Sequence, residues 1–182
     1  NADIIIDSEN DIKTLLNDLS DMNVIVAPNI IEDNSLNRGW HIPKPMDDVA
    51  LNIPSIRKKY FNKHLKYPDT YYKNHLSKVD TVSGSFFLMT SNHLQNINFF
   101  DENVFLYYEE NIFGIKTKLL KKNIVIDNDI DVVHNHAISI DKSMKRIKKY
   151  DALKKSQYYF EKNYNHANLF SLILLKITIF IT

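Results

Sequence analysis

Three groups of polar residues have side chains and spacings that could carry out chemistry. The first is Asn1-Ala2-Asp3, at the edge of an isoleucine-rich segment that we expect to be a strand. A carboxylate at the end of a strand can hold a divalent cation, and such a cation can neutralise a diphosphate leaving group. Asn and Asp are also common turn residues beside strands, so the triplet taken alone favours a structural role.

The second group is the acidic pair Glu109-Glu110, which follows Tyr107-Tyr108 at the expected start of a helix. A general base needs a carboxylate of tuned pKa close to the hydroxyl that it deprotonates, and two adjacent acids among aromatic residues can provide one. Carboxylates in a first helical turn also interact favourably with the helix dipole. Taken alone, the pair therefore favours helix capping.

The third group is His134, at the end of the apolar pair Val132-Val133, with His136 two residues later. Neutral imidazole is a common metal ligand, but a histidine at the end of a strand is as often a surface residue. Both interpretations stay open. The other histidines have no partner at a recognisable spacing, and we expect them to be structural or exposed: His41, His64, His75, His93 and His166.

Composition limits the classes of protein. With 182 residues and 44% hydrophobic residues, the chain can form one ordinary domain with a core. A net charge of +1 gives no global attraction to nucleic acid. The absence of cysteine excludes disulfides, thiolate metal sites and a cysteine nucleophile, and it fits the cytoplasm as the default compartment.

The pattern of apolar residues predicts an α/β fold. A strand over 1–6 precedes a helix that Asp7 or Ser8 can cap, and a helix over 109–122 has apolar residues at helical spacing. The remaining expected strands are short: 24–27, ended by Pro28, then 124–126 and 132–133, together with the β-type run 79–90 around Ser83-Gly84-Ser85. Residues 29–78 are expected to be loops and short helices that shape a pocket.

The order of these motifs resembles the family 2 glycosyltransferases of the GT-A fold, particularly their rhamnosyltransferase-like and capsular-polysaccharide branch. The likeness is closest over 82–139, where the chain carries V-S-G, F-D-E, F-L-Y-Y-E-E and V-V-H in the family's order. The resemblance implies a GT-A-like mixed sheet, with residues 1–140 as the later part of the catalytic domain. It also implies that donor-binding strand and helix units precede Asn1.

The resemblance further implies a role for each polar group. Asn1 and Asp3 correspond to the family's D-x-D-type motif, with Asp3 holding Mg²⁺ or Mn²⁺ against the diphosphate of a UDP- or dTDP-sugar donor. Glu110 takes the position of the catalytic base, with Glu109 as the alternative. His134 corresponds to a late histidine on the metal side. The implied reaction is an inverting transfer of the sugar to a polysaccharide or lipid-linked acceptor.

Two segments are expected to contact the acceptor. Ser83, Gly84 and Ser85 would let the backbone approach the acceptor sugar, as the resemblance implies. Trp40 lies in the aromatic-rich loop 29–78 and is expected to help select the acceptor, although aromatic residues there could equally be ordinary packing.

The last part of the chain, 141–182, is expected to be a basic amphipathic helix followed by an apolar tail. Residues 142–163 hold eight lysines and arginines against two acids, which suits an anionic membrane surface or simply a solvated helix. Residues 169–182 are too few to span a bilayer and could be interfacial, a core helix or part of a longer anchor. Peripheral attachment to the inner face of the cell membrane is the resulting expectation.

Other functions remain possible from the sequence. A non-catalytic module that binds carbohydrate or a membrane surface would keep the same fold without turnover. A metal-dependent hydrolase using Glu110 and His134 is a third hypothesis, but the chain lacks the paired histidines at i and i+4 that identify such enzymes. Nucleic-acid binding ranks last, since no recognition motif accompanies the basic helix.

Overall fold

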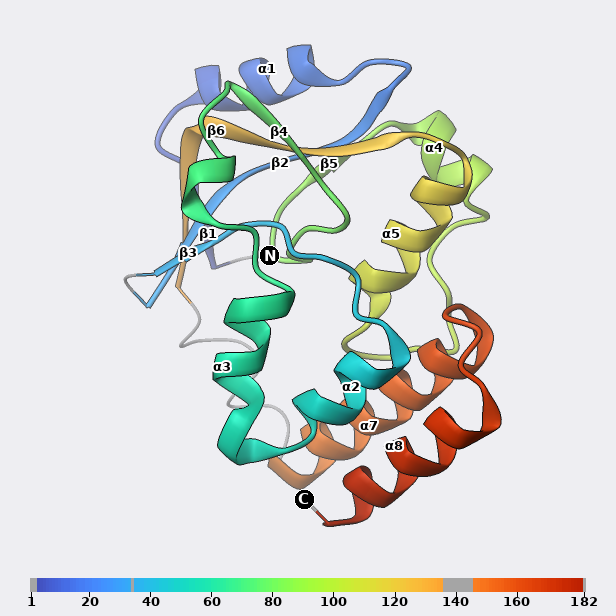
Figure 1. The fold of residues 1–182 in the computed structure, drawn as a ribbon. Coiled ribbons are helices and arrows are strands. Elements are labelled where there is room, and N and C mark those ends of the chain that lie inside the picture. The colour runs from blue at the N-terminus through green and yellow to red at the C-terminus, as the bar shows by residue number, and fades with distance from the viewer. Residues whose placement is uncertain (1–2, 34, 136–145, 182) are drawn as a thin grey trace.

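A computed structural model of the protein describes residues 3–33, 35–135 and 146–181. They form a mixed six-stranded sheet with helices on both faces (Figure 1). The α/β class expected from the sequence is therefore confirmed. The expected boundary between residues 140 and 141 lies outside the described residues.

The sheet is built on two long strands that run parallel, β2 (Asn23–Glu32) and β6 (Asn123–His134). Short antiparallel strands extend it on both sides: β1 (Ile4–Ile5) and β4 (Leu76–Val79) pair with β6, whereas β3 (Ser35–Asn37) and β5 (Leu88–Met89) pair with β2. Because β2 and β6 run in the same direction, their carboxyl ends lie at the same edge of the sheet.

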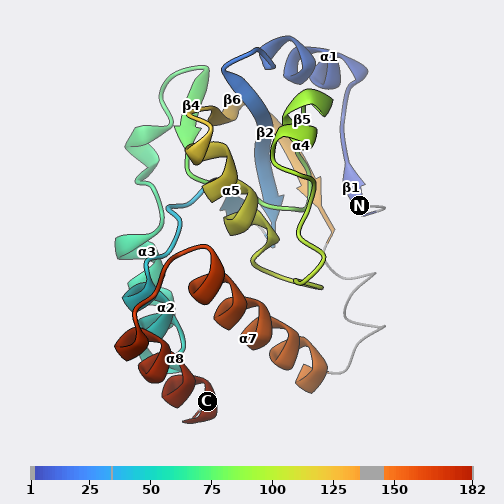
Figure 2. The same ribbon diagram turned by 90° about the vertical axis from the view of Figure 1, so that its right-hand side faces the viewer.

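The helices of the described residues are α1 (Glu9–Asp18), α2 (Pro45–Leu51), α3 (Pro54–His64), α4 (Ser91–Asn96), α5 (Glu109–Leu119), α7 (Arg146–Asn163) and α8 (Leu169–Ile181), with a 3₁₀ turn at Asp69–Tyr71. Ser8 caps α1, since its hydroxyl accepts a hydrogen bond from the Asn10 N–H over 3.1 Å. Helices α2, α3, α7 and α8 gather beyond one end of the sheet (Figure 2). Among the helices placed in the structure, none is long and apolar enough to cross a membrane.

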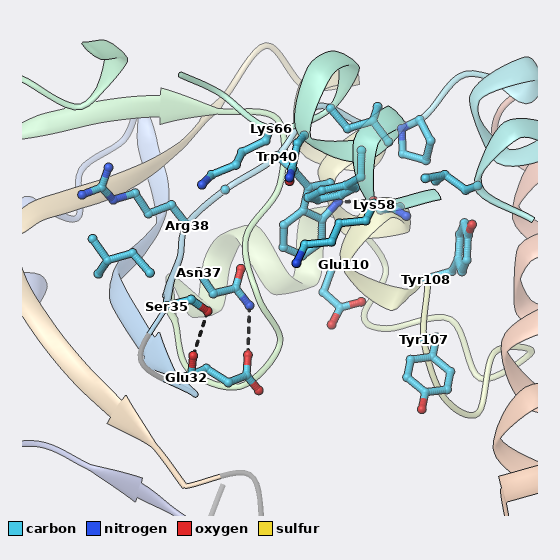
Figure 3. Close-up of a pocket in the computed structure, with 18 residues that line it drawn as sticks. Glu32, Ser35, Asn37, Arg38, Trp40, Lys58, Lys66, Tyr107, Tyr108 and Glu110 are labelled. Atoms are coloured by element: carbon cyan, nitrogen blue, oxygen red, sulfur yellow. Dashed lines mark hydrogen bonds between the residues drawn. The ribbon is translucent and has the colours of Figure 1, made fainter. Parts of the chain in front are cut away.

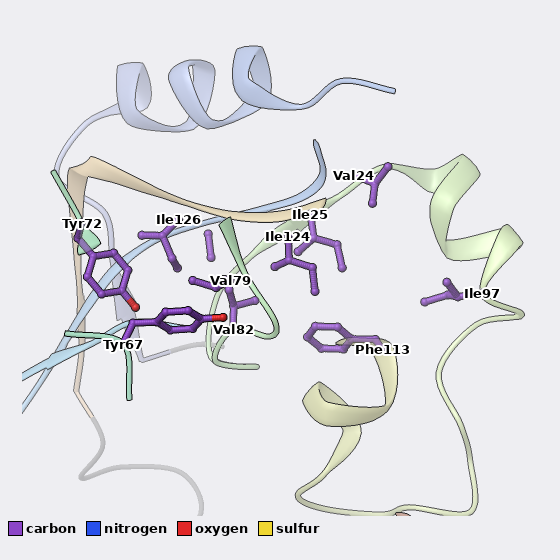
Figure 4. Close-up of a cluster of buried hydrophobic side chains, with 11 residues drawn as sticks. Val24, Ile25, Tyr67, Tyr72, Val79, Val82, Ile97, Phe113, Ile124 and Ile126 are labelled. Carbon is purple, nitrogen blue, oxygen red and sulfur yellow. The ribbon is translucent and has the colours of Figure 1, made fainter. Parts of the chain in front are cut away.

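Apolar side chains alternate between the two faces of β6, as the two-residue period of a strand requires. Ile124 and Ile126 pack in the cluster that contains Phe113 of α5 (Figure 4). Val125 lies on the opposite face, in the cluster that contains Leu15 of α1. The alternation fixes α1 and α5 on opposite faces, and α5 carries the acidic pair at its first turn.

The two parallel strands lose their register at Pro28. Pro28 pairs with Asp127, but the next residue, Asn29, pairs with Asp131, so three extra residues of β6 bulge outward. The Asn29 side-chain amide donates to the Asn128 carbonyl over 3.0 Å and to Asp131 Oδ1 over 2.9 Å, which supports the bulge. The prediction that Pro28 ends the strand is wrong, because its missing N–H falls where the ladder with β6 is already interrupted.

Two other predicted elements differ from the structure. The two short strands expected at 124–126 and 132–133 are one strand, β6, which runs through the bulge. The β-type run expected at 79–90 is mostly loop, since β4 ends at Val79 and β5 covers only Leu88–Met89. The glycine in its centre therefore lies in a turn rather than in a strand.

Helix α7 packs directly under the start of α5. Its fully buried Phe160 contacts a cluster with Tyr108 and Ile112. Leu153 packs against the same cluster, and the inward face of α7 also includes the buried charged residues Lys154 and Glu161, whereas Ile147 is exposed. Lys154, one of the basic residues of 142–163, is therefore packed inside the protein and does not belong to a solvated basic face.

Candidate active site

A cavity of about 710 Å³ opens beside β3 and between α3 and the start of α5 (Figure 3). Its lining includes Trp40, Glu110 and Glu32. Trp40 and Glu110 are sequence-predicted site residues, whereas Glu32 is not. The cavity therefore joins the predicted base to a carboxylate that the sequence analysis did not identify.

Glu110 is held in place by the loop that contains Gly84. The Gly84 N–H donates a hydrogen bond to Glu110 Oε1 over 3.2 Å. A methyl group added at Gly84 would lie only 2.6 Å from the same oxygen, so a larger residue would displace the carboxylate. On the other side, the Thr81 hydroxyl donates to the Glu110 backbone carbonyl over 2.6 Å. The carboxylate therefore has a fixed position at the cavity.

The surroundings of Glu110 raise its pKa to about 7. Burial disfavours the charged carboxylate and is the largest cause, followed by repulsion from the neighbouring Glu109. Hydrogen bonds from backbone amides, including that of Gly84, offset part of this effect. Burial also raises the pKa of Glu109. A carboxylate with a pKa near neutrality is suited to accept and release a proton at physiological pH.

The acidic pair begins α5 immediately after two residues in the left-handed conformation. Tyr107 has φ of 66° and Tyr108 has φ of 69°, which is uncommon for residues other than glycine. The Tyr108 hydroxyl is anchored at depth, donating to Asp48 Oδ1 over 2.7 Å. Such strain persists only where the surrounding structure imposes it, and it is concentrated at functional sites. Here it aims the first turn of α5 at the cavity.

The edge of the sheet beside the cavity holds a second cluster, formed by Asp3, Glu32 and His134. His134 Nε2 lies 3.6 Å from Asp3 Oδ1, and His134 Nδ1 lies 3.2 Å from Glu32 Oε1. The side chains of Asp3 and His134 are 6% and 8% exposed, so the contact is largely removed from water. The imidazole is thus held between two carboxylates, one at each ring nitrogen.

The sheet topology explains why these residues meet. Ile4 pairs with His134 across β1 and β6, which brings the preceding Asp3 alongside. Ile31 pairs with Val133 across β2 and β6, so Glu32 reaches the same edge. The predicted association of Asp3 with His134 is therefore observed, while Asn1 and His136 lie outside the described residues. Glu32 was missed because β2 was expected to stop at Pro28.

Glu32 links this cluster to the cavity wall. Its Oε2 accepts a hydrogen bond from the Asn37 side-chain amide over 3.3 Å, and its carbonyl accepts one from the Ser35 hydroxyl over 2.8 Å (Figure 3). Ser35 and Asn37 belong to β3 and also line the cavity. Glu32 therefore contacts the His134 imidazole through Oε1, and it contacts the cavity-lining residues Ser35 and Asn37 through its carbonyl and Oε2.

The expected acceptor residues divide into two groups. Trp40 lines the cavity and donates its indole N–H to Asn111 Oδ1 over 3.1 Å. Ser83, Gly84 and Ser85 are not among the lining residues, and the two serine hydroxyls bond each other over 2.9 Å. Gly84 instead contacts Glu110. The structure thus associates this turn with the position of the carboxylate.

Three basic residues of the cavity lining were not identified from the sequence: Arg38, Lys58 and Lys66. Arg38 is fixed by a hydrogen bond from its Nε to Asn29 Oδ1 over 3.0 Å and by the Tyr72 ring, 4.4 Å from its guanidinium carbon. These residues are spread over 38–66 with no recognisable spacing, and they come together at one cavity only in the folded protein. Their charge suits an anionic ligand.

No protein-family model matches the chain, and no curated protein matches it. The chemistry of the site therefore rests on its own residues.

Proposed function

We propose that this protein is a metal-dependent, inverting glycosyltransferase that moves a sugar from a nucleotide-sugar donor to a polysaccharide or lipid-linked acceptor. One observation carries the proposal. A single cavity is lined both by Glu110 and by Glu32, and Glu32 contacts the imidazole that faces Asp3. A candidate base and a candidate cation site thus lie beside one cavity, as the family resemblance implies.

Glu110 acts as the general base in this proposal. It takes the proton from an acceptor hydroxyl while the hydroxyl oxygen forms a bond to the anomeric carbon of the donor sugar. The bond from that carbon to the diphosphate breaks, and the nucleoside diphosphate leaves with the electron pair. Attack from the face opposite to the leaving group inverts the anomeric centre. The pKa of about 7 supports this assignment because a carboxylate near neutrality is an effective base.

Asp3 and His134 are the residues that would hold the Mg²⁺ or Mn²⁺ implied by the resemblance, and the imidazole ligand favours Mn²⁺. A buried carboxylate oxygen and an imidazole nitrogen 3.6 Å apart are a donor set that fits a divalent cation. Glu32 contacts the other ring nitrogen, which is the arrangement that orients a metal-binding histidine. When bound, such a cation supplies charge neutralisation for the diphosphate leaving group.

The basic lining residues support an anionic donor. Arg38, Lys58 and Lys66 line the cavity together with Glu110. They would attract the phosphates of a UDP- or dTDP-sugar, while Trp40 offers an aromatic surface of the kind on which sugar rings can pack. In this proposal the three basic residues contact the donor diphosphate, and Trp40 contacts the acceptor sugar.

The C-terminal helix supports attachment to an anionic membrane, where lipid-linked acceptors reside. Apolar side chains of α8 are exposed, with Phe170 66% and Phe180 94% accessible. Lys155, Lys162 and Lys176 lie with Phe180 around a groove between α7 and α8. Lysines beside exposed aromatic residues match a surface that combines acyl chains with negative headgroups.

Calorimetric titration with UDP and dTDP, with and without Mn²⁺, tests the proposal. Because the resemblance implies donor-binding segments ahead of Asn1, the titration is run on this chain and on a version extended upstream. Mn²⁺-dependent binding that Asp3→Ala abolishes is the expected result. Asp7→Ala is the matched control, since Asp7 is an exposed acid four residues away. If neither version binds a diphosphate, the proposal fails and a non-catalytic binding module takes its place.

A further inference from the structure

A second group of ligand-type side chains lies outside the cavity described above. Asp18 is the last residue of α1, His75 precedes β4, and Asp127 is the residue of β6 at which the bulge begins. One potential ligand atom from each of these three residues lies within 4.8 Å of the other two. None of the three lines the cavity that contains Glu110. The cluster is therefore separate from the proposed catalytic site.

The imidazole of His75 connects the three acids around it. Its Nδ1 lies 2.7 Å from Asp129 Oδ2 and 3.6 Å from Asp127 Oδ1, and its Nε2 lies 3.2 Å from Asp18 Oδ1. In the neutral tautomer that donates Nδ1–H to Asp129, the lone pair of Nε2 faces Asp18. A carboxylate on one ring nitrogen that leaves the other to a metal is a recurrent arrangement in metalloproteins.

Asp127 supplies an independent observation that points to a ligand. Its side chain is completely buried and its Oδ1 accepts a hydrogen bond from the Asp129 N–H over 2.9 Å. Within the described part of the chain, its Oδ2 receives no hydrogen bond from an N–H or hydroxyl group, and the same holds for Asp18 Oδ2. A fully buried carboxylate oxygen in this situation is costly unless a proton or a cation compensates it.

The two carboxyl groups also approach each other. One carboxylate oxygen of Asp18 and one of Asp127 lie within 4.8 Å of each other. Two like charges this close are compatible with a proton shared between them or with a cation bound between them. The adjacent His75, whose side chain is 48% exposed, favours the cation because it adds a nitrogen ligand and leaves an entry path from solvent.

We propose that Asp18, His75 and Asp127 form a structural site for a divalent transition-metal cation of the Zn²⁺ or Mn²⁺ class. Mixed imidazole and carboxylate ligands suit these ions better than Ca²⁺ or Mg²⁺, which favour oxygen ligands. The cation would join the end of α1, the segment before β4 and the bulge of β6. It would thereby fix the point from which β6 continues to His134.

The test is titration of the metal-free protein with Zn²⁺ by calorimetry, in an Asp3→Asn background that weakens the other candidate site. Binding of one Zn²⁺ per chain is expected, with at least a tenfold loss of affinity in His75→Gln. His41→Gln is the matched control, because His41 is also partly exposed and lies 3.1 Å from the carboxylate of Asp80. The control should bind Zn²⁺ like the background protein.

A second variant separates loss of the site from loss of the fold. Asp127→Asn keeps the shape of the buried side chain while removing its charge, and far-ultraviolet circular dichroism checks that it remains folded. Weak Zn²⁺ binding by a folded Asp127→Asn variant supports the proposal. Absence of Zn²⁺ binding in the background protein would overturn the proposal and leave the shared proton as the explanation. So would Zn²⁺ binding by His75→Gln and Asp127→Asn that is as tight as that of the background protein. The Zn²⁺ titration uses an Asp3→Asn background, so its result does not depend on whether the proposed donor site at Asp3 is correct.

Discussion

The Gly84 N–H donates a hydrogen bond to Oε1 of Glu110 over 3.2 Å, and a Cβ atom at Gly84 would lie 2.6 Å from that oxygen. The contact explains why this position is glycine, although its backbone φ is not in the left-handed region. The absence of a side chain lets the loop approach the carboxylate. Glu110 is therefore positioned by a residue that precedes it by 26 positions.

Gly84→Ala should displace the Glu110 carboxylate and reduce kcat by at least about tenfold, since a misplaced base loses most of its contribution. Ser55→Ala is the control, because Ser55 is exposed and neither lines the cavity nor contacts Glu110. Sugar transfer measured for both variants checks the prediction. Equal rates for Gly84→Ala and the parent protein would mean that the position of this carboxylate does not matter.

The activity should depend on pH through the ionisation of Glu110. A base must be deprotonated to act, so kcat/KM should be nearly constant above the pKa of about 7 and fall about tenfold per pH unit below it. A pH–rate profile of the parent protein tests this. A profile that stays flat between about pH 5 and about pH 8 would contradict the assignment of Glu110 as the base.

Glu32→Gln should weaken Mn²⁺ binding, because Glu32 lies 3.2 Å from the Nδ1 atom of His134 and would orient the imidazole toward Asp3. Loss of such a supporting contact costs about 10- to 100-fold in metal affinity. Electron paramagnetic resonance of free Mn²⁺ gives the affinity directly. Glu102→Gln, an exposed acid, should leave it unchanged, and an unchanged affinity in Glu32→Gln would assign Glu32 to the cavity alone.

The buried carboxyl groups of Asp48 in α2 and Glu161 in α7 should make the stability of the protein depend on pH. Burial and then the charge of Asp48 raise the pKa of Glu161 to about 9, well above its unfolded value. Between these two pKa values only the folded state keeps the proton, so the contribution of Glu161 to stability is fully present below the unfolded pKa and is lost as pH rises toward 9. Glu161→Gln resembles the protonated form and should remove this contribution.

Urea unfolding of the parent and Glu161→Gln proteins at pH 6 and pH 8 measures the effect. The free energy of unfolding of the parent should fall by roughly 2–3 kcal/mol more than that of the variant over this interval. Asn165 donates to Glu161 Oε1 over 2.9 Å, and a glutamine can retain this contact. Identical pH dependence in the two proteins would show that Glu161 ionises normally.

Replacing the exposed aromatic residues of α8 should abolish membrane binding. The fraction of the double variant Phe170→Ser, Phe180→Ser that sediments with vesicles containing phosphatidylglycerol should be at least about tenfold lower than that of the parent. The reason is that each aromatic ring contributes roughly 1.5–3 kcal/mol when the membrane buries it. The matched control is Leu16→Ser, Leu119→Ser, which alters two exposed apolar residues elsewhere. Equal losses in both variants, or no binding by the parent to any vesicle, would contradict membrane attachment.

Sequence patterns correctly predicted the helices whose positions depend on neighbouring residues. The helical spacing of apolar residues places α1 and α5, and Ser8 caps α1 as expected. The acidic residues at the start of α5 are also local, so Glu110 could be proposed without a structure. The predicted proximity of Asp3 and His134 is observed because β1 and β6 pair beside them.

Features that depend on contacts between distant segments could not be predicted in this way. The bulge lets β2 continue beyond Pro28, and Glu32 reaches His134 only because of that continuation. Gly84 meets Glu110 through a loop whose course no local pattern specifies. Lys154 and Glu161 are buried although charged helix residues are usually exposed, because Asn52 and Asp48 of neighbouring segments interact with them.

The most direct measurement is release of nucleoside diphosphate from UDP- and dTDP-sugars in the presence of Mn²⁺ and extracted lipid-linked glycans. It compares Glu110→Gln with Glu109→Gln, on the version of the protein that binds donor. Release by the parent and by Glu109→Gln, with a loss on the order of 10²- to 10⁴-fold in Glu110→Gln, is the predicted result. Equal release by both variants, or no release by the parent with any donor, would contradict glycosyl transfer at this site.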